Sequence, residues 1–152
     1  MTGAVFKELC RARRAVAALE FALLAVPLLL IVLGIIEFGR VLWTREALQM
    51  TAVQGARCMG ILASSCASTG SYSSTNTTSY IESVAAAWGV TLTGSNLTLT
   101  RNSTNTACAP TGGTPNISEV TITYTFHTMV PGMLTMLSSN SLGGHACFPN
   151  NQ

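Results

Sequence analysis

The feature that most constrains this chain is an uncharged apolar run near its start, from Phe21 to Ile36, set between Glu20 and Glu37. Taken alone, this run is too short to cross about 30 Å of hydrocarbon. The longer segment from Val16 to Ile36 reaches roughly 31 Å at about 1.5 Å per residue. The sequence therefore predicts a transmembrane helix, with Glu20 at its inner boundary.

Basic residues precede the apolar run and set its orientation. Lys7, Arg11, Arg13 and Arg14 lie on its N-terminal side, although the net charge of the whole chain is only +2. Clustered basic residues are retained in the cytoplasm, which places the C-terminal part outside. The alternative for such a cluster is a nucleic-acid patch, but its position beside the helix favours an anchor. We expect no nucleic-acid partner.

A cleavable secretory signal is the competing explanation of the apolar run. It would need a small-x-small cleavage site after the apolar core. The core is followed instead by Glu37-Phe38-Gly39-Arg40, which is a poor site. The sequence therefore favours a signal-anchor that stays in the membrane.

The helical pattern continues beyond the membrane segment. Apolar or small residues recur at helical spacing on one face, at Val41, Leu48, Ala52, Gly55, Met59 and Leu62. We expect three parts: a basic leader over residues 1–15, a transmembrane and stem helix over 16–62, and an extracytoplasmic head over 63–152. The fold class is α+β, with a long N-terminal helix continuing into a head that holds a short helix and an antiparallel sheet.

Within the head, turn residues and alternation suggest the order of elements. Ser64 to Thr78 is rich in Ser, Thr, Gly and Asn and is interpreted as a loop. Ser79-x-x-Glu82 is a capping-box pattern that predicts the start of a short helix, which Gly89 would end. Strands are predicted where apolar residues alternate with threonine, at Val90 to Thr93, Leu97 to Arg101 and Glu119 to Phe126. A last helical turn is expected over Met129 to Leu137, followed by a polar tail.

Four of the five cysteines follow the membrane segment: Cys58, Cys66, Cys108 and Cys147. An even number in an oxidising compartment is consistent with two disulfides, and four cysteines allow three connectivities. We favour Cys58 with Cys66, closing a short loop at the end of the helix, and Cys108 with Cys147. Zinc is the alternative, but the chain lacks a C-x-x-C pair, and His127 and His145 have no ligand spacing. We expect no metal site.

Charged residues suited to catalysis are scarce. The chain has no aspartate, and between Cys58 and Gln152 its charged residues are Glu82, Arg101 and Glu119. Nucleophilic catalysis needs a base held by a third group beside a serine or cysteine. The sequence offers no such pattern, and no phosphate-binding or dinucleotide loop. We expect neither catalytic residues nor a cofactor, and therefore a protein that is not an enzyme.

Glu20 has a special position relative to the bond between Ala15 and Val16. If a peptidase cut this bond, Val16 would carry a free amino group and Glu20 would become the fifth residue. When such helices bundle, the carboxylate of one could pair with the amine of a neighbour. A charge at the centre of a membrane helix costs about 2.5 to 3.5 kcal/mol, so pairing would offset a real penalty. Alternatively, Glu20 reaches the headgroup layer and pairs with Arg13.

These residues resemble the TadE-like family, the minor pilins or pseudopilins of tight-adherence (Tad/Flp) pili, which are related to type IV pilins. The resemblance covers roughly Arg13 to Arg57, about a third of the chain. It rests on Arg14-Ala15, Glu20-Phe21, Gly34-Ile35-Ile36-Glu37-Phe38-Gly39-Arg40, Ala47-Leu48-Gln49 and Gly55-Ala56-Arg57. Two departures are Ala15, where prepilin sites usually have glycine, and Phe21, where major Flp pilins have tyrosine.

The resemblance implies cleavage between Ala15 and Val16 by a prepilin peptidase and an assembly role for Glu20. It also implies a function in building a Flp-type pilus used in adhesion, biofilm formation or secretion. Other pilin subunits and the Tad secretion platform would be the partners. The expected location is the bacterial inner membrane, with a periplasmic head and possible incorporation into the extracellular pilus. The alternative is an uncleaved single-pass envelope protein whose head binds a surface without forming a polymer.

Overall fold

The computed structural model describes residues 2–103, 108, 116–128 and 141–150, with side chains described from residue 16 onward. It divides the chain into two compact units, residues 1–39 and residues 40–152, each of which is described by itself. One helix, α1 (Thr2–Gly60), contributes to both units. The division at residue 15 between leader and stem stays a prediction.

The first unit is the N-terminal part of α1. Its large apolar side chains from Val16 to Ile36 are exposed, as Leu24 illustrates with 71% of its surface accessible. The helix is long and apolar enough to cross a membrane from Val16 onward. Such a helix suggests a membrane anchor, because exposed apolar side chains over this length match the hydrocarbon of a bilayer rather than water. The predicted apolar helix is confirmed.

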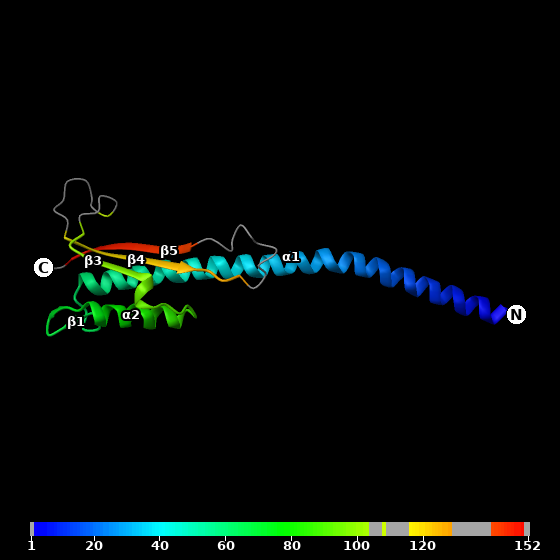
Figure 1. Ribbon diagram of the computed structural model, residues 1–152, viewed down its shortest axis with the longest axis horizontal. Helices are drawn as coiled ribbons and strands as arrows, with labels where there is room; N and C mark the ends of the chain where they lie inside the picture. Colours follow the sequence, from blue (N-terminus) through cyan, green and yellow to red (C-terminus); the bar gives the residue numbers. More distant parts are fainter. Residues whose placement is uncertain (1, 104–107, 109–115, 129–140, 151–152) are drawn as a thin grey trace. The chain divides into compact units, whose positions relative to one another are not determined.

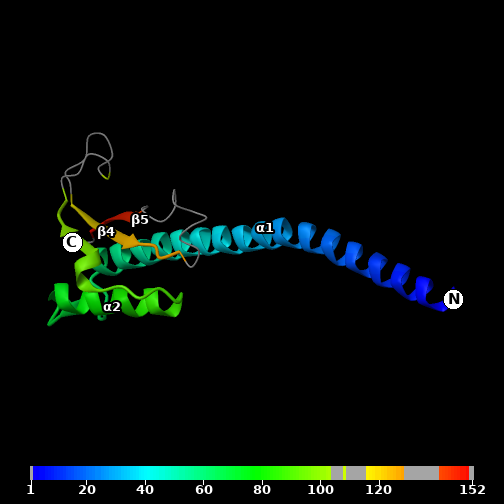
Figure 2. The same cartoon turned by 45° about the vertical axis from the view of Figure 1, so that its right-hand side comes forward.

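In the second unit, residues 40–60 of α1 lie between a second helix and a sheet (Figures 1 and 2). The helix on one side is α2 (Ser74–Ala87). On the other side is an antiparallel sheet of order β3-β4-β5, formed by β3 (Leu97–Arg101), β4 (Ile117–Thr125) and β5 (Ser141–Pro149). A small hairpin of β1 (Ala67–Ser68) and β2 (Ser71–Tyr72) follows α1, and the 3-10 turn η1 (Gly94–Asn96) precedes β3. This arrangement confirms the predicted α+β class.

Small residues on α1 allow the layers to approach closely. Ala47, Ala52 and Ala56 are buried on this helix. A Cβ atom at Gly55 would lie 2.7 Å from Cδ1 of Ile81 on α2, and one on Gly144 of β5 would overlap the backbone of Leu48. Helix α1 thus packs closely against the Ile81 side chain of α2 at Gly55, and almost backbone to backbone against β5 at Gly144. Leu48, Met59, Ile81, Val120 and Ile122 fill the core.

The second helix begins earlier than the capping-box pattern predicts. Its N-cap is Ser73, whose hydroxyl accepts a hydrogen bond from the backbone N–H of Asn76 at 3.3 Å, so Ser79 and Glu82 lie inside α2. The predicted helix start was therefore wrong, and the predicted loop contains the β1–β2 hairpin and the first turns of α2. Thr77, Ile81 and Ala85 form the buried stripe of this helix. Its predicted end is confirmed, since Gly89 follows the C-cap with a φ of +79°.

Two of the three predicted strands are present in the structure, and the third is not. Leu97 to Arg101 is confirmed as β3, and β4 shows the predicted alternation, with Val120 and Ile122 fully buried. The predicted strand Val90 to Thr93 was wrong: Val90 and Leu92 are buried, but the segment pairs with no strand among the described residues. The tail proved to contain β5, an edge strand. The expected turn at Met129 to Leu137 lies outside the described residues.

Candidate functional site

The residues predicted to act in processing and assembly all belong to α1. Val16 is 55% exposed, and Glu20 is exposed one helical turn later. Residues four apart lie on the same helix face. Val16 and Glu20 therefore share a face of α1, while the roles of Ala15, Val16 and Glu20 stay predictions.

The first disulfide, Cys58–Cys66, lies where α1 ends. Its Cα atoms are 5.9 Å apart, and both residues are buried, with 4% and 0% of their surfaces accessible. Inside the loop that it closes, Leu62 has a φ of +51°, and the N–H of Ala63 donates to the carbonyl of Cys58. The crosslink therefore fastens the reversal of the chain after α1 to the core.

The second disulfide, Cys108–Cys147, lies on the outer face of the sheet. Strand register explains what surrounds it: Glu119 of β4 pairs directly with Cys147 of β5, and Thr121 pairs with His145. Because alternate residues of a strand share a face, Cys147 and His145 point to the same side as Glu119. The opposite side of β5 carries Gly144 and Ala146, which are buried.

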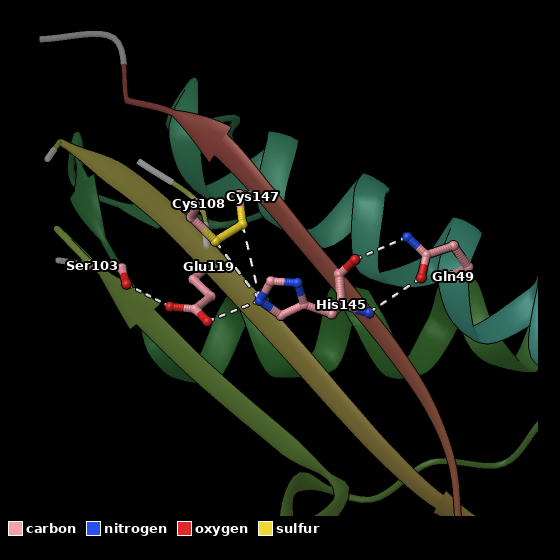
Figure 3. Close-up of polar contacts among 6 residues, drawn as sticks. All are labelled: Gln49, Ser103, Cys108, Glu119, His145 and Cys147. Carbon is pink, nitrogen blue, oxygen red and sulfur yellow. Dashed lines mark hydrogen bonds and ion pairs between the residues drawn. A yellow bond between two sulfur atoms is a disulfide. The ribbon is translucent and has the colours of Figure 1, made fainter. Parts of the chain in front are cut away.

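These side chains form what we call the outer-face cluster, consisting of Cys108, Glu119, His145 and Cys147 (Figure 3). His145 Nε2 lies 2.9 Å from Glu119 Oε1, 3.8 Å from Cys108 Sγ and 3.9 Å from Cys147 Sγ. The second carboxylate oxygen of Glu119 accepts a hydrogen bond from the Ser103 hydroxyl. One imidazole nitrogen thus lies close to a carboxylate oxygen and to both sulfur atoms.

Gln49 of α1 anchors β5 at the position of the histidine (Figure 3). Its side-chain Nε2 donates to the backbone carbonyl of His145 at 2.9 Å, and its Oε1 accepts from the backbone N–H of His145 at 3.3 Å. A primary amide presents one donor and one acceptor side by side, as a neighbouring strand would. Gln49 thereby pairs with both the backbone N–H and the backbone carbonyl of His145. This pairing fixes the backbone position from which the imidazole extends.

Residues 15–57 match the TadE-like protein family. No curated protein and no solved structure gives a significant match. The TadE-like region runs from Ala15 along α1 to Arg57, so it includes Glu20 and Gln49 but none of the outer-face cluster. The resemblance predicted from the sequence is confirmed over this region. The match suggests that this is a Tad pilus-associated protein and that it is associated with a membrane.

Beyond the TadE-like region, the geometry of the outer-face cluster argues against nucleophilic catalysis. In a Cys–His–carboxylate arrangement, one imidazole nitrogen faces the nucleophile and the carboxylate holds the other. Here the same nitrogen, Nε2 of His145, faces both Glu119 and the sulfurs, and the sulfurs are joined to each other. The cluster therefore lacks the geometry of an activated thiol.

The cluster does hold ligand types that bind metals. Ligand atoms of Cys108, His145 and Cys147 all lie within 4.8 Å of one another. The spacing of these residues along the sequence did not reveal the group, because Cys108 is far from the others in sequence and β5 was expected to be a tail. The available signal was His145-x-Cys147, since residues two apart share a face only if the segment is a strand. Of the two histidines in the sequence, His127 follows β4 and lies outside the cluster.

Proposed function

We propose that this protein is a TadE-like minor pilin, or pseudopilin, that takes part in assembly of a tight-adherence (Flp-type) pilus. Such a pilus would serve adhesion, biofilm formation or secretion. The observation that carries the proposal is the TadE-like match, which starts at Ala15, beside the predicted cleavage bond, and follows α1 to Arg57. The exposed apolar surface of α1 supports insertion of this segment in a membrane.

Cleavage between Ala15 and Val16 by a prepilin peptidase would prepare the helix for assembly. It would leave an ammonium on Val16, one turn before the carboxylate of Glu20. In a bundle of such helices, the carboxylate of one subunit would pair with the ammonium of the next. A carboxylate near hydrocarbon is costly without a partner, so this pairing would favour one axial register between neighbouring subunits.

The leader would set the orientation of the protein in the membrane, and the head would be presented outside it. Basic residues of the leader would keep the N-terminus in the cytoplasm, and the head would face the periplasm from the inner membrane. The two disulfides fit such an oxidising compartment. Partners would be other pilin subunits, the Tad secretion platform and the peptidase, and we propose no enzymatic role for the head.

N-terminal sequencing of the membrane-extracted protein tests the processing step. We expect Val16 as the first residue, with Ala15→Gly processed as well and Ala15→Leu left uncleaved, because the peptidase accepts a small residue at this place. A mature protein that starts at Met1 or Thr2 would contradict processing. That result would favour the uncleaved single-pass envelope protein instead.

The assembly role needs a separate measurement. Glu20→Ala should leave the protein inserted and processed but reduce surface pili strongly, whereas Glu20→Asp should retain most of them. Counting pili by electron microscopy, with immunoblots to show equal subunit levels, provides the comparison. Normal piliation in the Glu20→Ala strain would contradict the proposed pairing.

A further inference from the structure

The outer-face cluster lies on strands and a linker that the TadE-like match does not cover. Its four side chains come from three segments: Cys108 before β4, Glu119 on β4, and His145 and Cys147 on β5. Two sulfurs, an imidazole nitrogen and a carboxylate oxygen are the ligands that zinc binds in proteins. In the oxidised protein the two sulfurs are consumed by their mutual bond.

We propose that the outer-face cluster is a redox-gated site for a zinc-class divalent cation. Cys108, His145 and Cys147 would bind the ion, with Glu119 completing the set, once the Cys108–Cys147 disulfide is reduced. This proposal does not depend on the pilin function. In the oxidised head the disulfide would link Cys108 to Cys147, and in the reduced head the bound metal would link them.

The chemistry requires a reductant of the dithiol class. A dithiol transfers two electrons and two protons to the disulfide, becomes a disulfide itself, and leaves thiols on Cys108 and Cys147. The cation then displaces both thiol protons, so that two protons leave for each metal bound. His145 would bind as the neutral imidazole through Nε2, and Glu119 as the carboxylate.

Distances in the oxidised head already approach those of a tetrahedral site. With Zn–S near 2.3 Å and Zn–N near 2.0 Å, ligand sulfur and nitrogen lie about 3.5 Å apart. His145 Nε2 is 3.8 Å from Cys108 Sγ and 3.9 Å from Cys147 Sγ. Two sulfur ligands need about 3.8 Å between them, a separation that breaking the disulfide allows. Forming the metal site therefore requires mainly that the two sulfur atoms move apart.

The surroundings hold the remaining ligands in place. Gln49 fixes the backbone of His145 from α1, and Ser103 donates a hydrogen bond to the carboxylate of Glu119. Direct pairing of Glu119 with Cys147 across the sheet sets their separation. Partners that orient ligands in this way commonly change metal affinity by about 10- to 100-fold.

Exposure makes this disulfide the more accessible of the two. The side chain of His145 is 44% exposed, and Cys108 and Cys147 are half-buried. In contrast, Cys66 is completely buried in the Cys58–Cys66 pair. Exchange requires access to a sulfur atom, so a mild reductant should open the outer disulfide first.

The test uses the full chain in detergent and Co²⁺ as a spectroscopic substitute for zinc. A phosphine, which takes up an oxygen from water as it reduces a disulfide, serves as the reductant because it avoids adding competing thiols. Mass spectrometry after alkylation identifies which cysteines have been reduced to free thiols. We expect the protein with Cys108 and Cys147 reduced to bind one Co²⁺ per chain with thiolate-to-cobalt charge-transfer absorption, and the oxidised protein to show none.

Variants assign the ligands. Cys108→Ser, Cys147→Ser and His145→Ala should each weaken binding by at least 100-fold, and Glu119→Gln by at least 10-fold. Cys10→Ser and His127→Ala are matched controls, because they remove the cysteine of the leader and the other histidine, and binding should be unchanged. Circular dichroism of every variant establishes that it is folded.

Three results would overturn the proposal. One is a folded protein, reduced at Cys108 and Cys147, that shows no thiolate-to-cobalt absorption. Another is absorption that persists in Cys108→Ser and Cys147→Ser, since the metal would then be bound by other thiols. Binding that survives His145→Ala unchanged would exclude the imidazole and with it the proposed site.

Discussion

Gln49 hydrogen-bonds through its side-chain amide to both backbone groups of His145, 96 residues later in the chain. The contact ties the edge strand β5 to the helix that carries the TadE-like match. It is also the point where Leu48 and Gly144 approach too closely to admit a Cβ atom on the glycine. Backbone proximity and amide pairing therefore act together to position the outer-face cluster over α1.

Gln49→Ala should destabilise the head, because it leaves the edge N–H and carbonyl of His145 without these partners. We expect a loss of about 1 kcal/mol in the free energy of unfolding, since the bonds lie at an exposed position and water replaces part of them. Denaturant unfolding of the detergent-solubilised chain measures the change. Gln54→Ala, at an exposed position on the same helix, should have little effect. Equal stability of the two variants would show that the amide pairing contributes nothing.

Gly55→Ala should be destabilising despite the better helix propensity of alanine. Its added methyl would lie 2.7 Å from Cδ1 of Ile81, which is fully buried, so α1 and α2 would have to separate or Ile81 change rotamer. Overpacking of this kind costs about 1–3 kcal/mol. Gly39→Ala is the matched control, because a methyl there meets no atom within 4 Å among the described residues. Thermal unfolding should rank Gly55→Ala below the parent chain and Gly39→Ala level with it or above.

Thr51→Val should maintain or raise stability. Thr51 is fully buried on α1, and its hydroxyl has no hydrogen-bond partner among the described residues. Replacing a buried, unpaired hydroxyl with a methyl of similar shape removes a desolvation penalty of about 1–3 kcal/mol. Thr44→Val provides the contrast, because the hydroxyl of Thr44 donates to the carbonyl of Arg40 at 2.9 Å. A marked loss of stability in Thr51→Val alone would mean that the hydroxyl has a partner in the folded head.

Periodicity predicted the parts of this fold that depend on local pattern, and missed those that depend on distant contacts. The apolar helix and the alternation of Val120 and Ile122 on β4 were readable, because burial on one face leaves a repeat in the sequence. Strand β5 was not, since Gly143-Gly144 and Pro149 are typical of turns and the glycine is required by the backbone of Leu48 across the core. The outer-face cluster depends on that strand, so it could not be predicted either.

The start of α2 offers a direct test between the sequence pattern and the structure. If Ser73 is the N-cap, as its hydrogen bond with the N–H of Asn76 indicates, then Ser73→Ala should lower stability by about 1 kcal/mol. Ser79 lies exposed inside α2, so Ser79→Ala should be neutral or slightly stabilising, because alanine has the higher helix propensity. Were the helix to begin at the capping-box pattern instead, the order of the two variants would reverse. Unfolding curves of the pair, measured under identical conditions, distinguish the two N-caps without reference to any other part of the chain.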